Sequence, residues 1–251
     1  MQKLFSLSVF ILALIMPFQS AFAAFQQEVQ IDIEVDDVAP APSIYFRLQQ
    51  CKEIIQKAYD AMPEYHRSGL KRLKILWSAK MGRGLGGGDE IHLRCNNVSD
   101  KELIGVFVHE MGHIADTGVY RGNAASGESQ FQDSRIQLFE DDESIDFYKI
   151  SWLNVKQKQR DSSNLDFVTG YAMTDPFEDF AESYTFYILH GRQFKQMMQQ
   201  STRLKRKYEF LKENIFDGKE FVNKYRKPNL KTRDYDSTVL PFSLENFLKR
   251  R

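Results

Sequence analysis

The stretch His109-Glu110-Met111-Gly112-His113 decides the fold of this chain. Histidines at positions i and i+4 share one face of a helix, so two imidazoles would point to a common place. Neutral imidazoles at this spacing supply two ligands of a tetrahedral zinc site. The glutamate between them is placed to take the proton of a water that the metal activates. The motif therefore predicts a zinc-dependent hydrolase, most simply a peptidase, with one Zn²⁺ per chain.

The residues around the motif predict a helix over residues 100–116. Ser99 and Glu102 have the spacing of a capping box at its start. Gly112 would keep the helix narrow where other backbone approaches it. The apolar contacts of the helix would come from Leu103, Val106, Phe107 and Met111. The motif is therefore expected on an amphipathic, capped helix, where its two histidines converge.

A site of this kind needs a third protein ligand. A metzincin would have glycine at 116 and histidine at 119, whereas this chain has Asp116 and Val119, which excludes that class. A glutamate on a second helix is the other common arrangement, and Glu178 and Glu182 stand at i and i+4 of a helix predicted over residues 176–190. We assign Glu178 to the metal and Glu182 to the support of a ligand histidine. Two surface acids on a helix are the alternative.

Two segments together resemble the catalytic domain of anthrax lethal factor and the bacterial Pro-Pro endopeptidases, which are gluzincins. They are HEMGHIAD, residues 109–116, and YAMTDPFEDFAE, residues 171–182. The family has H-E-x-G-H with a nearby aspartate, then a tyrosine, then a glutamate seven positions later within E-x-F-A-E. The resemblance implies that Glu178 is the third zinc ligand and that Tyr171 stabilises the oxyanion. It also implies that Glu182 supports a histidine and that Asp116 is the nearby aspartate behind the ligands. A tyrosine that only packs is the alternative for Tyr171.

The expected fold is α+β and zincin-like, with a small mixed sheet above the H-E-x-x-H helix and a mainly helical C-terminal lobe. Strands are predicted over residues 29–35, 70–79 and 90–95, and a helix over residues 43–61. In zincins the strand before the zinc helix is an edge strand that pairs with extended substrate, so residues 90–95 are expected at the edge.

Three further features belong to this lobe. The glycine-rich residues 82–88 are expected to be a flexible connection, with a flap over the cleft as the alternative. His92 could face the cleft, although an ordinary histidine is the commoner case, and His66 and His190 are interpreted as structural. Residues 117–170 match no pattern.

The N-terminal residues have the features of a signal peptide. Lys3 is followed by an apolar run, and Ala21-Phe22-Ala23 fits an A-x-A cleavage site. We therefore expect residues 1–23 to be removed, residues 24–42 to be a lead-in segment and residues 43–251 to be the catalytic domain. The mature protein is expected to be periplasmic or secreted, without a stable membrane anchor.

The chain has two cysteines, Cys51 and Cys95. An exported protein meets oxidising conditions, which favours one disulfide between them, with two buried thiols as the alternative. The 34 basic and 34 acidic side chains balance, so nothing in the net charge favours a nucleic acid partner. The sequence as a whole predicts a monomeric, exported zinc endopeptidase that acts on peptides or proteins. An exported zincin with a narrow cell-envelope processing role, or a non-catalytic zinc-binding protein, is the alternative.

Overall fold

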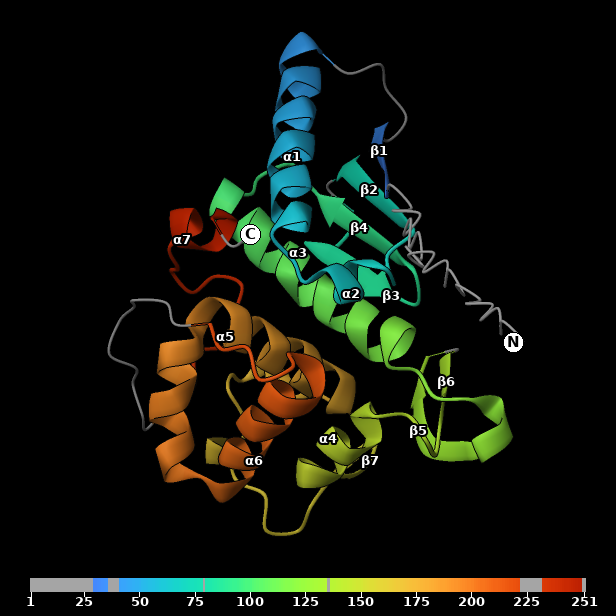
Figure 1. Ribbon diagram of the computed structural model, residues 1–251. Helices are drawn as coiled ribbons and strands as arrows, with labels where there is room; N and C mark the ends of the chain where they lie inside the picture. The colour runs from blue at the N-terminus through green and yellow to red at the C-terminus, as the bar shows by residue number, and fades with distance from the viewer. Residues whose placement is uncertain (1–28, 36–40, 79, 135, 222–231, 250–251) are drawn as a thin grey trace, which may run out of the picture.

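The computed structural model describes residues 29–35, 41–78, 80–134, 136–221 and 232–249. The predicted signal peptide lies outside these residues. Helix α3 (Asp100–Ile114) runs through the middle of the molecule, between a sheet with its covering helix on one side and a group of helices on the other (Figure 1). The Ser99 hydroxyl accepts a hydrogen bond from the Glu102 N–H, so α3 begins where the sequence predicts. The expected α+β class is confirmed.

The sheet has four strands in the order β1 (Gln30–Val35), β2 (Arg72–Trp77), β4 (Glu90–Arg94) and β3 (Gly84–Gly87). The first three are parallel and β3 is antiparallel to β4, so the sheet is mixed. Side chains alternate across each strand, and the four that point to one face, Leu73, Ile75, Ile91 and Leu93, are fully buried. Helix α1 (Pro42–Asp60) and α3 pack on this buried face. The packing on this buried face therefore holds α3 against the sheet.

The strand at the edge beside α3 is β3, and two of our expectations about this region are wrong. Glu90–Arg94 pairs with β2 on one side and β3 on the other, so the strand before the motif is internal. The glycine-rich connection contains the edge strand itself. The reason is close packing: a Cβ at Gly84 would lie 2.3 Å from Glu110 Oε1, and one at Gly86 would lie 2.9 Å from Glu110 Oε2. Glycine at both positions lets β3 lie directly over α3.

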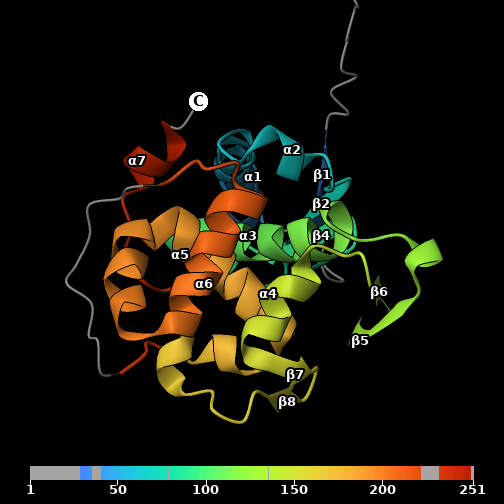
Figure 2. The same ribbon diagram turned by 60° about the horizontal axis from the view of Figure 1, so that its bottom comes forward.

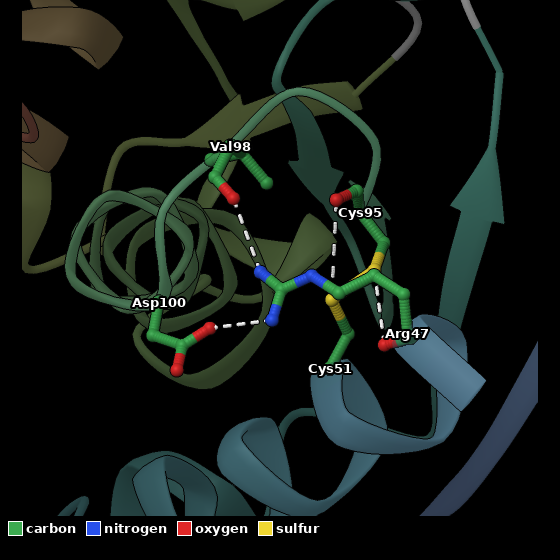
Figure 3. The surroundings of a disulfide bond; sticks show 5 residues. All are labelled: Arg47, Cys51, Cys95, Val98 and Asp100. Carbon is green, nitrogen blue, oxygen red and sulfur yellow. Dashed lines mark hydrogen bonds and ion pairs between the residues drawn. A yellow bond between two sulfur atoms is a disulfide. The ribbon is translucent and has the colours of Figure 1, made fainter. Parts of the chain in front are cut away.

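Helix α1 is fastened to both the sheet and the start of α3 (Figure 3). Cys51 of α1 forms a disulfide with Cys95, which follows β4. One turn earlier, the guanidinium of Arg47 donates hydrogen bonds to Asp100 Oδ1 at 2.7 Å and to the Val98 carbonyl at 3.1 Å. These contacts hold the loop that leads from the sheet into α3.

The C-terminal half is mainly helical, as expected. Its elements are hairpin β5 (Glu128–Asp133) and β6 (Ile136–Phe139), α4 (Ser144–Ser151), hairpin β7 (Trp152–Asn154) and β8 (Gln157–Lys158), α5 (Pro176–Met197), α6 (Thr202–Phe210) and α7 (Leu244–Leu248). The short α2 (Glu64–Arg67) belongs to the other half. Figure 2 shows the β5–β6 hairpin standing apart from the helices, at the side of the molecule.

Helix α5 is longer than predicted. It continues beyond residue 190 with a local kink at His190, whose φ is −130°. Gly191 therefore lies inside the helix and does not end it. The glycine serves a close contact instead, because a Cβ there would lie 2.1 Å from the Phe221 carbonyl oxygen. Among the described residues, no helix combines the length and apolar character needed to cross a membrane.

Candidate active site

Helices α3 and α5 cross closely, and this crossing brings the predicted ligands together. Pro176 occupies the first turn of α5, and the Asp175 side chain accepts hydrogen bonds from two backbone N–H groups of that turn, one of them from Glu178. Glu178 is thereby fixed at the start of the helix. On α3, a Cβ at Gly112 would lie 2.8 Å from Ala181 Cα. The small residues at this contact explain why the two helices can approach.

The two histidines and Glu178 form one cluster. Their ligand atoms lie within 4.8 Å of one another. Glu178 Oε2 is 3.1 Å from His109 Nε2 and 3.5 Å from His113 Nε2. Both imidazoles are buried, and Glu178 is partly buried. All three predicted zinc ligands therefore present their donor atoms to the same point.

The charged groups of this cluster shift one another's pKa values. Burial alone would lower the pKa of His109, but Glu178 and Glu182 raise it well above its ordinary value. Burial alone would raise the pKa of Glu178, but the two imidazoles hold it well below its usual range. Two imidazole nitrogens and one carboxylate oxygen are also donors that zinc takes. The residues therefore fit the zinc ion that the sequence predicts.

Two carboxylates lie behind the cluster, and they differ in their contacts. Glu182 is fully buried, and its Oε1 lies 3.0 Å from His109 Nδ1, the ring nitrogen that faces away from Glu178. Asp116 is also fully buried, and its Oδ1 accepts a 2.6 Å hydrogen bond from the Tyr148 hydroxyl. Burial raises the pKa of Asp116 to about 8. Among the described residues, no hydrogen bond joins Asp116 to His109 or His113, so its direct partner is Tyr148.

Tyr171 and Glu110 both lie beside the cluster, in the lining of the same cleft. Tyr171 lies on a short 3₁₀ turn (Tyr171–Met173), and its hydroxyl donates a 3.0 Å hydrogen bond to Glu178 Oε1. Burial raises the pKa of this phenol, which keeps its proton. Glu110 is buried under β3, and burial raises the pKa of its carboxyl, while His109 and His113 oppose that rise. The site thus holds a hydroxyl donor and a carboxylate beside the candidate ligands.

An open cleft of about 700 Å³ gives access to these groups. It is lined by β3 and β4, by the motif residues of α3, by the β5–β6 hairpin, by the turn that carries Tyr171 and by the start of α5. The lining residues are Gly84, Leu85, Gly86, Gly87, Glu90, His92, His109, Glu110, His113, Asp133, Ser134, Ile136, Tyr171, Asp175, Phe177 and Glu178. His92 lies in this lining, with its Nε2 2.8 Å from Glu90 Oε1. His66 and His190 are buried away from it, and His66 is hydrogen-bonded to the Tyr184 hydroxyl.

Three groups of residues at the site are not predicted from the sequence. The hairpin residues come from a segment that matched no pattern, and the glycines of β3 were interpreted as a connection. The one sequence signal for the β3 glycines is that Gly84 and Gly86 stand at alternate positions before a predicted strand. Thr169 and Ser237, which both donate to Glu182, carry no local signal. Their proximity to Glu182 arises only when the chain is folded.

Comparison with known proteins identifies the family. The residues that match its model, 94–232, include both the H-E-x-x-H helix and the start of α5. A search of curated proteins and a search of solved structures gave no match. The matched residues make up more than half of the chain, and the protein therefore belongs to the family described as "Putative zinc-binding metallo-peptidase".

Proposed function

We propose that the protein is a zinc endopeptidase of the gluzincin type, in which His109, His113 and Glu178 hold the metal. The observation that carries this proposal is the meeting of these three donors, within 4.8 Å, in an open cleft beside Glu110. A purely structural zinc site is closed and needs no base. Here the cleft leaves room for a substrate, and the glutamate of the motif is present.

The mechanism divides the chemistry between the metal and the chain. Zinc held at this site would polarise the scissile carbonyl and make a water molecule acidic enough to attack it at neutral pH. Glu110 takes the proton of the attacking water and passes it to the leaving amine. Its burial under β3 supports this role, because desolvation raises the pKa of the carboxyl and strengthens it as a base. The Tyr171 hydroxyl, already beside Glu178, donates to the oxyanion that develops on the carbonyl oxygen.

The edge strand supports a peptide as the substrate. Among the described strands, β3 pairs only with β4, so the backbone groups of its other side can pair with an extended chain. Three of its four residues are glycines, so the strand has few side chains of its own that could block access to this edge. An extended peptide bound there would cross the cleft above Glu110. Main-chain pairing of this kind favours an endopeptidase, because it requires residues on both sides of the cleaved bond.

The likeness to lethal factor and the Pro-Pro endopeptidases is part of the proposal. Two contacts support it: the Tyr171 hydroxyl on Glu178, and Glu182 behind His109. Both agree with the roles that the resemblance implies. The cleavage specificity of those enzymes is not carried over, because the β3, β4 and hairpin residues that line this cleft lie outside the two resembling segments.

Casein digestion with the mature protein tests the function. The zinc-loaded wild type should digest casein, and a chelator followed by added zinc should remove and restore the activity. Glu110→Gln should bind zinc and fold as the wild type does, yet lose about 100- to 10,000-fold in rate. Activity close to that of the wild type in Glu110→Gln would refute the proposed base. If no peptide is cleaved although zinc is bound, the non-catalytic alternative replaces the enzyme.

Export is proposed as well, on two grounds. Residues 1–23 have the pattern of a signal peptide, and a Cys51–Cys95 disulfide suits an oxidising compartment. Cell fractionation with N-terminal sequencing of the recovered protein tests this. A mature N-terminus at residue 24 or 25, outside the cytoplasm, is expected; an uncleaved cytoplasmic chain would contradict it.

A further inference from the structure

The carboxylate of Glu182 receives hydrogen bonds from two distant segments of the chain. Thr169 donates from its hydroxyl to Oε2 at 2.5 Å. Ser237 donates twice, from its backbone N–H to Oε2 at 2.9 Å and from its hydroxyl to Oε1 at 2.7 Å. Oε1 is also the atom that lies 3.0 Å from His109 Nδ1. All four residues are buried, and Thr169, Glu182 and Ser237 are fully so.

The segment that carries Ser237, residues 234–238, is bound to other parts of the site. The N–H groups of Gly170 and Tyr171 donate to its carbonyls at 2.8 and 2.6 Å. Arg83, which immediately precedes β3, pairs with Asp236 and donates to the Thr238 hydroxyl. The segment therefore connects the edge strand, the turn that carries Tyr171 and the buried Glu182. It follows the end of the family match at residue 232.

We propose that Ser237 is a positioning residue of the metal site, acting on His109 through Glu182. This inference rests on the proposed function, since it presumes that His109 binds zinc through Nε2. A carboxylate can turn about its last bond, and three donors on its two oxygens fix its plane. Fixed in this way, Glu182 holds Oε1 3.0 Å from His109 Nδ1, so that a proton on this nitrogen would be favoured when Nε2 binds the metal. His109 Nε2 is then left with a free electron pair facing His113 and Glu178.

The contacts distinguish this role from plain packing. Ser237 donates both its N–H and its hydroxyl to Glu182, so both of its hydrogen-bond donors are directed at one carboxylate. A serine that only filled space would not need to point its hydroxyl at Glu182. Removing the hydroxyl leaves Oε1, the oxygen nearest His109, without its fixed donor. The expected consequence is a looser His109 and weaker metal binding, with the overall fold retained.

Zinc affinity, measured by competition with a chromophoric chelator, tests the proposal. Ser237→Ala should raise the zinc dissociation constant about tenfold, at the lower end of the effect usual for partners of metal-ligating histidines. Ser243→Ala is the matched control. Ser243 caps α7 through Asn246 N, in the same C-terminal region, so its loss should lower the melting temperature of the zinc-free protein without changing zinc affinity. The visible spectrum of the cobalt-substituted protein should change in Ser237→Ala and not in the control.

A second pair of variants covers the case that Ser237→Ala fails to fold. Thr169→Val should weaken zinc binding, whereas Thr169→Ser, which keeps the hydroxyl, should restore it. Equal zinc dissociation constants in the wild type, Ser237→Ala and Thr169→Val would overturn the proposal while leaving the proposed function intact. If Ser237→Ala does not fold, equal constants for Thr169→Val and the wild type would overturn it. A wild type that binds no zinc would overturn both.

Discussion

The hydroxyl of Tyr171 has a defined partner beside the candidate metal ligands. It donates to Glu178 Oε1 at 3.0 Å, and burial raises the pKa of the phenol, so the proton stays available. The ring also lies 5.9 Å from that of His109, centroid to centroid. A donor held beside the candidate metal ligands costs little reorganisation when charge develops on a substrate oxygen. That placement is the ground for the role in oxyanion stabilisation that we propose for Tyr171.

Tyr171→Phe should lower kcat and leave KM and zinc content nearly unchanged, because the lost hydrogen bond to the oxyanion forms mainly in the transition state. The loss of one such donor typically costs about 3–4 kcal/mol, or roughly 100- to 1,000-fold in kcat. Tyr235→Phe is the matched control, because Tyr235 is exposed and its ring lies beside that of Tyr171. Steady-state kinetics on a peptide that the wild type cleaves decide the matter. A kcat in Tyr171→Phe equal to that of the wild type would show that Tyr171 only packs.

Among the secondary-structure elements, strand β3 most restricts where the side chain of Glu110, the proposed base, can lie. Its glycines allow the strand to touch Glu110, and its free edge remains open to the cleft. A side chain at Gly84 or Gly86 would push β3 away from α3 or displace the carboxylate of Glu110. The strand thus restricts the position of Glu110, the proposed base, and offers the edge on which we propose that a peptide pairs.

Gly86→Ala should reduce hydrolysis about 100-fold with zinc content unchanged, because its Cβ would displace Glu110 and not the metal ligands. Gly82→Ala is the control, since its Cβ would meet only the Gly84 carbonyl oxygen, at an ordinary 3.7 Å. Activity assays paired with metal analysis measure both effects. Full activity in Gly86→Ala would show that β3 does not constrain the base.

The elements differ in how far the sequence could predict them. α3 and the start of α5 carry their signals locally, in the serine cap, Pro176 and the i, i+4 pairs. β3 could not be predicted, because G-L-G-G has low strand propensity and becomes a strand only through β4 and its contact with α3. The Ser237 contacts with Glu182 join residues 55 positions apart, and no local pattern encodes them.

At the scale of the whole molecule, two buried histidines outside the site link stability to pH. Burial lowers the pKa of His66 and of His190 from about 6.5 to about 4. Each is therefore neutral in the folded protein near pH 5, while the unfolded chain would bind the proton. Their contribution to stability is complete above about pH 6.5 and is lost as the pH falls toward 4. Buried carboxyls with raised pKa values, such as Asp142, oppose this trend.

A comparison of variants isolates the histidine contribution from the other groups. The free energy of unfolding should be measured for the wild type and His66→Gln at pH 7.5 and pH 5. The stability advantage of the wild type should shrink by about 2 kcal/mol between the two pH values, because only the wild type loses the His66 contribution. An unchanged advantage would mean that His66 titrates normally in the folded protein.

Zinc content tests the central claim, that α3 and α5 together build a three-ligand metal site. Wild type, Glu178→Ala and Glu143→Ala would be dialysed against a weak chelator and analysed for zinc per chain. Glu143 is an exposed glutamate beside α4 and controls for the loss of one acidic residue. The account predicts about one zinc per chain in the wild type and in Glu143→Ala, and little in Glu178→Ala. Full zinc occupancy in Glu178→Ala would contradict it.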